Sequence, residues 1–321
     1  MFLSCEDQLH ETYWQTFMPF MDEKMLTGRV AMANNVEIYY QFYQPENAKA
    51  LVVIMPGRAE SCFKYAELCY EMQKNGFAIL LFDHQGQGLS TRRCLNPQIG
   101  FVDQFEDYIQ DAIQLIGTVQ TEQSITNLPI YLLAHSMGGA IGSCVMIEKP
   151  ALFEKAVLMA PMYGISAPIP VWLAKKLVSI GLKRQLNKQL DADYFWGQQN
   201  YIPVEFSKNH LTHSQQRYQY FVETHSQNAK LQLGGVSFQW LQQAFRMMEY
   251  IKVNLDRIQT PSKIFLATQD TVVNSDEIKK LANRVKNAQL IEVQGAKHEI
   301  LFETDDLRHF ALRQIFDFFE L

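Results

Sequence analysis

One serine of this chain stands where a nucleophile is expected. Within residues 130–139, an apolar run ends at Ser136. Small residues flank this serine, with Ala134 two residues before it and Gly138 two residues after it. A serine that ends a buried strand and begins a helix sits on a sharp, strained turn, where bulky residues at those offsets would clash. The N-terminus of the following helix offers unpaired N–H groups to a developing oxyanion. The pattern predicts a nucleophile, although an ordinary strand–loop–helix junction has similar residues.

Two further polar residues follow apolar runs later in the chain, in the order acid and then histidine. Asp270 ends the run that begins at Lys263, and His298 lies in the loop after the run that begins at Leu290. In a triad with the order serine, acid, histidine, the carboxylate orients the imidazole and stabilises its protonated form. The imidazole takes the serine proton and later returns it to the leaving group. We therefore expect Ser136, Asp270 and His298 to form a catalytic triad.

Apolar runs bounded by turn residues indicate the elements that hold these side chains. An antiparallel hairpin is expected over 29–33 and 36–42, with a tight turn between them. Further strands are expected at 51–55, 77–82 and 155–159 and before each triad residue, and helices at 61–74 and 105–116. Strands that alternate with helices imply a mostly parallel sheet with its ligand site at the carboxyl ends of the strands. The sequence therefore predicts an α/β fold with the triad along one edge of the sheet.

This alternation stops between about residues 162 and 251, where aromatic and amphipathic pieces replace apolar strands. We expect 1–161 and 252–321 to form the core and 162–251 to form a helical cap insertion over the site. Met162 and Tyr163 follow a strand end directly. They are expected either to line an acyl pocket or simply to pack in the core.

The composition is that of one large globular domain, or of one domain with an insertion. The chain has 321 residues, of which 47% are hydrophobic and 20% charged, and its net charge of −5 does not suggest nucleic acid as a partner. The five cysteines are scattered and odd in number, which is typical of reduced thiols in a cytosolic protein. No apolar run reaches the roughly 18 residues of a membrane span, and the N-terminus lacks a secretory pattern. We therefore expect a cytoplasmic protein.

Several motifs resemble those of the α/β-hydrolases, and within them the monoglyceride-lipase-like and lysophospholipase group. The similarity is greatest to the bacterial lysophospholipases of the L-two type, and it runs from about residue 30 to the C-terminus. The segments that carry it are 56–61, 83–90, 134–139, 211–218 and 295–303. The resemblance implies an α/β-hydrolase fold, with a mostly parallel central sheet flanked by helices and a helical cap insertion.

The same resemblance implies an oxyanion hole made by the backbone N–H groups of Arg58 and Met137. Related lipases begin the first of these loops with His-Gly, whereas this chain has Pro56-Gly57. A backbone donor does not depend on side-chain identity, so Arg58 can serve. Its guanidinium is then available either to meet a phosphate or to pair with a nearby acid such as Glu60.

The activity implied by the resemblance is a serine hydrolase that removes the acyl chain of a lysophospholipid through an acyl-enzyme. No metal or cofactor is expected, because the sequence after His298-Glu299 lacks the second histidine of a zinc-binding His-Glu-x-x-His motif. The alternatives are a monoacylglycerol lipase or a general carboxylesterase, a peptidase of the proline-iminopeptidase type, and a non-catalytic binding protein with the same fold.

Residues 171–188 combine large apolar side chains with basic ones. The segment has five cations and no acid, although the whole chain is acidic; the cations are Lys175, Lys176, Lys183, Arg184 and Lys188. A basic amphipathic helix can lie on an anionic membrane surface. We expect either peripheral contact with an anionic inner membrane surface or a cap helix whose outer face is solvated.

Overall fold

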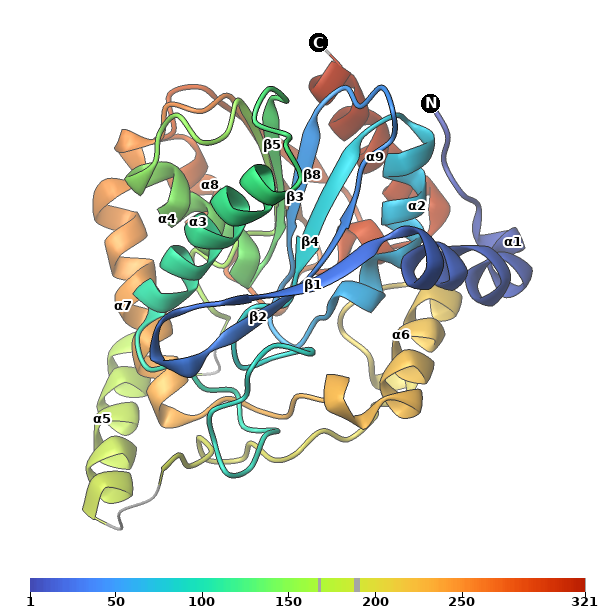
Figure 1. Ribbon diagram of the computed structural model, residues 1–321. Coiled ribbons are helices and arrows are strands. Elements are labelled where there is room, and N and C mark those ends of the chain that lie inside the picture. The colour runs from blue at the N-terminus through green and yellow to red at the C-terminus, as the bar shows by residue number, and fades with distance from the viewer. Residues whose placement is uncertain (167–168, 188–190, 321) are drawn as a thin grey trace.

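The computed structural model describes residues 1–166, 169–187 and 191–320, so that Lys188 of the expected basic helix lies outside the described residues. Within them, the strands form one eight-stranded sheet in the order β1-β2-β4-β3-β5-β6-β7-β8 (Figure 1). The strands are β1 (Leu26–Ala31), β2 (Glu37–Tyr43), β3 (Leu51–Met55), β4 (Ala78–Phe82), β5 (Ile130–His135), β6 (Lys155–Met159), β7 (Ser262–Ala267) and β8 (Ala288–Val293).

The first two strands form the expected hairpin, and β2 also runs antiparallel to β4. The remaining neighbours in the sheet are parallel, which confirms the mostly parallel sheet predicted from the sequence. The turn of the hairpin contains Asn34 and Asn35, both with positive φ, a conformation that asparagine tolerates better than most residues.

Helices cover both faces of the sheet. They are α1 (Glu6–Thr12), α2 (Ala66–Lys74), α3 (Phe105–Glu122), α4 (Met137–Glu148), α5 (Val171–Asn187), α6 (Gln215–Gln227), α7 (Phe238–Asn254), α8 (Ser275–Ala282) and α9 (Asp305–Glu320). Helices α3, α4, α7 and α8 lie on one side of the sheet and α1, α2 and α9 on the other (Figure 1). The side chains of each group form a buried cluster with the face of the sheet that they cover. Strands β3, β4 and β5 are therefore buried on both sides, which explains why they read as continuous apolar runs.

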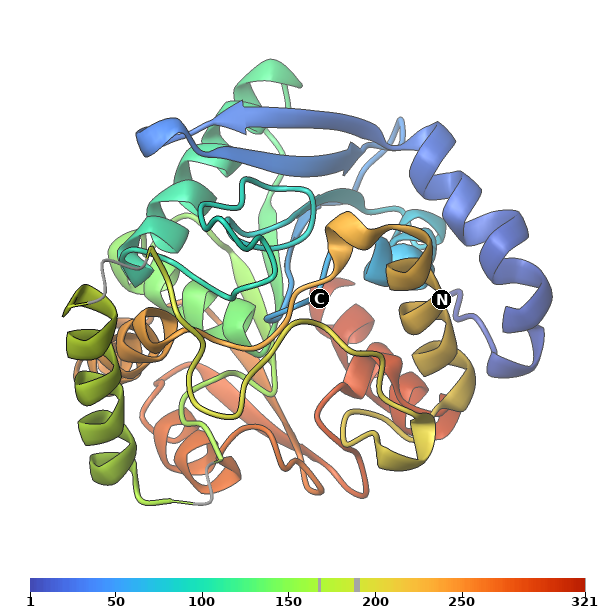
Figure 2. The ribbon, with the colours of Figure 1, turned by 90° about the horizontal axis from the view of Figure 1, so that it is seen from below.

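The insertion between β6 and β7 contains α5, α6 and α7. Helix α5 packs against α7, which in turn packs on α3 and α4. The connecting segments 191–214 and 228–237 cross the carboxyl edge of the sheet (Figure 2). They are held there by backbone hydrogen bonds such as Glu299 N–H to Leu211 O at 2.9 Å and a bridge between Gly100 and Val236. Among the described helices, none is long and apolar enough to cross a membrane.

Helix α6 is tied to the core by buried ion pairs. Arg217 donates to both carboxylate oxygens of Glu67 in α2 at 2.9 Å and to Asp305 in α9 at 2.8 Å. Arg308 lies beside this group and forms a bidentate pair with Glu71 at 2.7 and 2.6 Å. These charges join α2, α6 and α9 at one corner of the molecule.

Candidate active site

Ser136 lies on the sharp turn between β5 and α4, with φ 52° and ψ −113°. A residue other than glycine rarely adopts this conformation, and such strain clusters at functional sites. The turn needs small neighbours for a visible reason. A Cβ at position 138 would collide with the carbonyl oxygens of Met55 and Pro56, so Gly138 lets α4 begin directly beside the end of β3.

The loops after β7 and β8 bring Asp270 and His298 to this serine. His298 Nε2 lies 3.0 Å from Ser136 Oγ, and its Nδ1 lies 2.6 Å from Asp270 Oδ2. Burial raises the pKa of Asp270, but the hydrogen bond and charge of His298 and two backbone N–H groups outweigh it, and the pKa falls below its usual value. The arrangement places a base against a hydroxyl and an ionised carboxylate against the base.

The two expected oxyanion donors lie on adjacent segments. Met137 is the first residue of α4, where a backbone N–H has no acceptor within the helix. The close packing of Gly138 under Met55 and Pro56 puts the loop that contains Arg58 next to that helix end. The loop after β3 and the start of α4 are therefore neighbours, and the oxyanion role of Arg58 and Met137 stays a prediction.

The Arg58 guanidinium is not paired with Glu60, which was one of its two expected partners. Its Nη1 donates to the carbonyl of Gly234 at 2.9 Å, and the guanidinium lies 5.9 Å from the ring centre of Trp240. Glu60 is occupied by other groups, because Lys64 donates to its Oε1 at 2.8 Å and the Tyr65 hydroxyl donates to its Oε2 at 2.6 Å.

Glu60 belongs to a buried charged network that the sequence reasoning missed. Lys64 lies between Glu60 and Glu299, with its Nζ 2.5 Å from Glu299 Oε1. His135 Nδ1 lies 3.0 Å from Glu60 Oε1, and its Nε2 lies 3.3 Å from the carbonyl oxygen of His298. The network joins the loop after β3, the residue before the nucleophile and the residue after the histidine. The i, i+4 spacing of Glu60 and Lys64 was the available signal for its first half.

The charges in this network stabilise one another. Burial raises the pKa of Glu60, but Lys64 and then His135 lower it well below its usual range. Burial lowers the pKa of His135, but Glu60 reverses this effect and raises the pKa. The Glu60 and Glu299 carboxylates therefore share the Lys64 cation, and His135 adds a hydrogen-bonding partner to Glu60.

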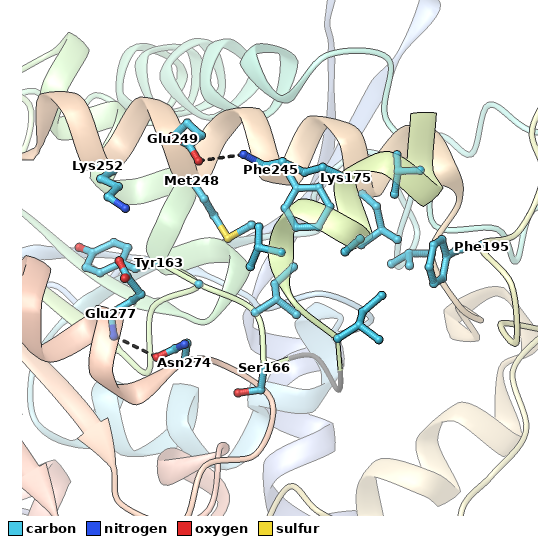
Figure 3. A pocket seen from close by; sticks show the side chains of 18 of the residues that line it. Tyr163, Ser166, Lys175, Phe195, Phe245, Met248, Glu249, Lys252, Asn274 and Glu277 are labelled. Carbon is cyan, nitrogen blue, oxygen red and sulfur yellow. Dashed lines mark hydrogen bonds and ion pairs between the residues drawn. The ribbon is translucent and has the colours of Figure 1, made fainter. Parts of the chain in front are cut away.

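A cavity of about 520 Å³ lies between α5, α7 and the loop after β6, and no triad residue is among its lining residues (Figure 3). Most of its lining is apolar, including Val178, Leu241 and Phe245. Tyr163 lines it, and the tyrosine hydroxyl lies 2.8 Å from Ser143 Oγ. Met162 is not among the lining residues; its side chain is buried, and its N–H donates to the Ser136 carbonyl at 2.9 Å.

Within the described residues, one group of possible metal ligands lies together. It consists of Cys5, Asp305 and His309, whose ligand atoms lie within 4.8 Å of one another. His309 Nε2 lies 2.7 Å from the carbonyl oxygen of Ser4 and 3.8 Å from Asp305. This histidine is thus engaged in holding the N-terminal segment against α9.

The fold and this site define a class of protein. A mostly parallel sheet with helices on both faces, and a serine on a strained turn after its central strand β5, is the arrangement of the α/β-hydrolases. Residues 46–305 match the family described as serine aminopeptidase, S33. The chain belongs to this family.

The chain is similar to several lipid-ester hydrolases. Lysophospholipase L2 of Escherichia coli (strain K12) is 31% identical over 308 residues, which cover 93% of this chain and 87% of that protein. The probable lysophospholipase L2 of Haemophilus influenzae is 30% identical over 312 residues, which cover 97% and 96%. A solved structure of a soluble monoglyceride lipase variant from Saccharomyces cerevisiae shares the fold, with a TM-score of 0.72 and 17% identity over 92% of this chain and 94% of that one. This chain is an ester-hydrolysing, lipase-like enzyme.

Proposed function

We propose that this enzyme is a lysophospholipase that works through Ser136, His298 and Asp270. The observation that carries the proposal is the position of His298, which contacts the serine hydroxyl with one ring nitrogen and the carboxylate with the other. A neutral imidazole held in this way accepts a proton on Nε2 while Nδ1 remains bonded to the acid.

The reaction then proceeds in two halves. Ser136 Oγ attacks the ester carbonyl as its proton passes to His298, and the N–H groups of Arg58 and Met137 stabilise the oxyanion. The bond to the glycerol oxygen breaks, His298 protonates that oxygen, and an acyl-enzyme remains. Water attacks the acyl-enzyme with His298 as base, which releases the fatty acid and restores the serine hydroxyl.

The substrate class rests on the relatives and on the shape of the site. Two relatives that this chain covers over most of their length carry the name lysophospholipase L2. We assign the acyl chain to the apolar cavity beside Tyr163, whose volume of about 520 Å³ lies within the roughly 300–1,000 Å³ typical of small-molecule sites. Residues 162–251 act in this proposal as a cap that covers the carboxyl edge and shapes that cavity.

The outer face of α5 supports peripheral binding to an anionic membrane. Trp172 is 67% exposed and Ile180 is 49% exposed. Lys176, Lys183 and Arg184 are exposed on the same helix, which has no acid among its residues. Exposed apolar side chains beside several cations are the combination that binds the surface of an anionic bilayer.

Fatty-acid release tests the substrate class. Purified enzyme and its Ser136→Ala variant would be given lysophosphatidylethanolamine, lysophosphatidylcholine, a monoacylglycerol, a short nitrophenyl ester and an aminoacyl nitroanilide. We expect a preference for the lysophospholipids that disappears in the variant. Activity confined to the monoacylglycerol or the short ester would reject the lysophospholipase assignment, and activity confined to the nitroanilide would indicate a peptidase.

A further inference from the structure

The Arg58 guanidinium has no carboxylate partner. In the described part of the chain, it forms no ion pair with an aspartate or glutamate, and its one hydrogen bond is the contact with Gly234 at 2.9 Å. The residue is only partly exposed, and burial lowers the pKa of its guanidinium. Arginine nevertheless stays protonated in proteins. A partly desolvated cation with several unused donors is a binding position for an anion.

Three other arginines of the chain have only structural contacts. Arg92 binds the same crossing segment of the cap, but its guanidinium donates to four backbone carbonyl oxygens. The acceptors belong to Gly88, Pro97, Lys230 and Gln232. The buried Arg217 and Arg308 each face carboxylates at 2.6–2.9 Å. Arg92 therefore suffices to hold the segment near Gln232, and the remaining donors of Arg58 are left for another ligand.

The position of Arg58 connects this cation to the reacting ester. Its backbone N–H is one of the two proposed oxyanion donors, so the side chain starts beside the ester carbonyl. In a lysophospholipid, only the glycerol backbone separates the reacting ester from the phosphate. An anion-binding group for this substrate must therefore lie within one side chain's reach of the oxyanion hole. The contacts with Gly234 and Trp240 hold the guanidinium on the cap side of that hole.

We propose that the Arg58 guanidinium binds the phosphodiester of the substrate while its backbone N–H binds the ester oxyanion. This inference rests on the proposed function and adds the residue that distinguishes a lysophospholipid from a monoacylglycerol. A monoacylglycerol has a neutral hydroxyl at the place of the phosphate, so it gains no charge-assisted hydrogen bond there. The contacts with the carbonyl of Gly234 and the ring of Trp240 restrain the guanidinium, which lowers the entropic cost of binding the anion.

The test compares kcat/KM for a lysophospholipid and a monoacylglycerol with the same acyl chain. Arg58→Gln and Arg58→Lys would be measured beside wild type, with Arg92→Gln as a matched control on the same cap segment. We expect the ratio of lysophospholipid to monoacylglycerol kcat/KM to fall roughly 10- to 100-fold in Arg58→Gln, as for the loss of hydrogen bonds to a charged group. Arg58→Lys keeps the charge but not the planar fork, so its ratio should lie between the two. The ratio should stay at the wild-type value in Arg92→Gln.

An unchanged ratio in both Arg58 variants would overturn the inference, because a purely structural arginine affects both substrates alike. A second readout uses the product-like glycerophosphoethanolamine as an inhibitor of short-ester hydrolysis. Its inhibition constant should rise in Arg58→Gln, and an unchanged constant would contradict phosphate binding. Failure of the proposed function looks different: wild type itself would then release fatty acid from the monoacylglycerol and not from the lysophospholipid.

Discussion

Asp270 uses its two carboxylate oxygens for different partners. One oxygen bonds His298 Nδ1, while the other accepts the backbone N–H groups of Val272 and Val273 at 2.7 and 3.1 Å. The backbone pair fixes the plane of the carboxylate, so the imidazole is held with its proton on Nδ1. Nε2 is then free to accept the proton of Ser136.

Replacing Asp270 by asparagine tests this tautomer argument. We expect kcat to fall roughly 10³- to 10⁴-fold in Asp270→Asn, because an amide favours the wrong imidazole tautomer. The measurement is turnover of a soluble ester, with the unfolding midpoint as a check on the fold. Asp276→Asn is the matched control, since Asp276 is an exposed acid a few residues further on. Near-full activity in Asp270→Asn would move the orienting acid elsewhere.

At the scale of elements, the buried network holds three loops in one arrangement. Lys64 lies at the start of the helical segment after β3, Glu299 follows the loop histidine, and His135 ends β5. The Lys64 ammonium also lies 4.4 Å from the ring centre of Phe302, which adds a cation–π contact. We infer that Lys64 is a positioning residue, because it touches neither the serine nor the imidazole yet links the loops that carry them.

Removing the Lys64 charge should destabilise the protein and misplace the loops. In Lys64→Met, two buried carboxylates lose their cation, and we expect a loss of about 3–5 kcal/mol in unfolding free energy. The pKa of Glu60 rises in the variant, so proton uptake relieves part of this loss at low pH. The difference in unfolding free energy between wild type and Lys64→Met should therefore widen as pH rises.

Chemical unfolding at several pH values and the pH profile of kcat measure both effects. Lys74→Met is the control, since Lys74 is an exposed lysine at the C-terminal end of α2. The double variant Lys64→Met with Glu299→Gln should recover part of the unfolding free energy that Lys64→Met alone loses. An unfolding free energy in Lys64→Met equal to that of wild type would show that the network carries no net stabilisation.

The amphipathic helix α5 makes a prediction about membranes. Reversing Lys176, Lys183 and Arg184 to glutamate should abolish sedimentation with phosphatidylglycerol vesicles, because the anionic surface would then repel the helix. The control makes the same charge change at three exposed lysines on other surfaces, which are Lys149, Lys230 and Lys286. Equal loss of binding in both variants would indicate a response to net charge alone, and unchanged binding in the α5 variant would reject this surface.

The elements of the core were predictable because their signals are local. The strands expected at 51–55 and 155–159 have the observed bounds, and the strand expected at 77–82 begins one residue later. The contacts of Arg58 and Lys64 were not predictable in this way. Arg58 meets a carbonyl 176 positions away and Lys64 meets a carboxylate 235 positions away. Such pairs depend on how segments that are distant in the sequence pack together, which no local pattern encodes.

At the scale of the whole molecule, buried charges hold α6 to α2 and α9. Glu67 receives Arg217 from α6 and lies 3.5 Å from Arg308 of α9. Burial raises the pKa of Glu67, but Arg308 and Arg217 outweigh it and lower the pKa to about 2. By contrast, the exposed pair of Lys175 and Glu249 links α5 to α7. We infer that α6 is the fixed side of the cap.

Glu67→Gln should therefore cost about 3–5 kcal/mol of unfolding free energy near neutral pH, because two buried guanidinium groups lose a shared charge. A depressed carboxyl pKa gives stability that is present above the unfolded value of 4.5 and is lost as pH falls toward about 2. The difference in unfolding free energy between wild type and Glu67→Gln should narrow as pH falls over that range. Glu249→Gln is the control and should change stability by about 1 kcal/mol or less. A gap that stays constant with pH would contradict this assignment.

In the proposed mechanism, Ser136 is the nucleophile that forms an acyl-enzyme. The most direct measurement is mass spectrometry of the protein after reaction with a serine-reactive lipid phosphonate. We expect one adduct, on the peptide that contains Ser136. It should be absent in Ser136→Ala and should form more slowly when lysophospholipid competes. An adduct on another residue, or an unlabelled protein that still releases fatty acid, would contradict it.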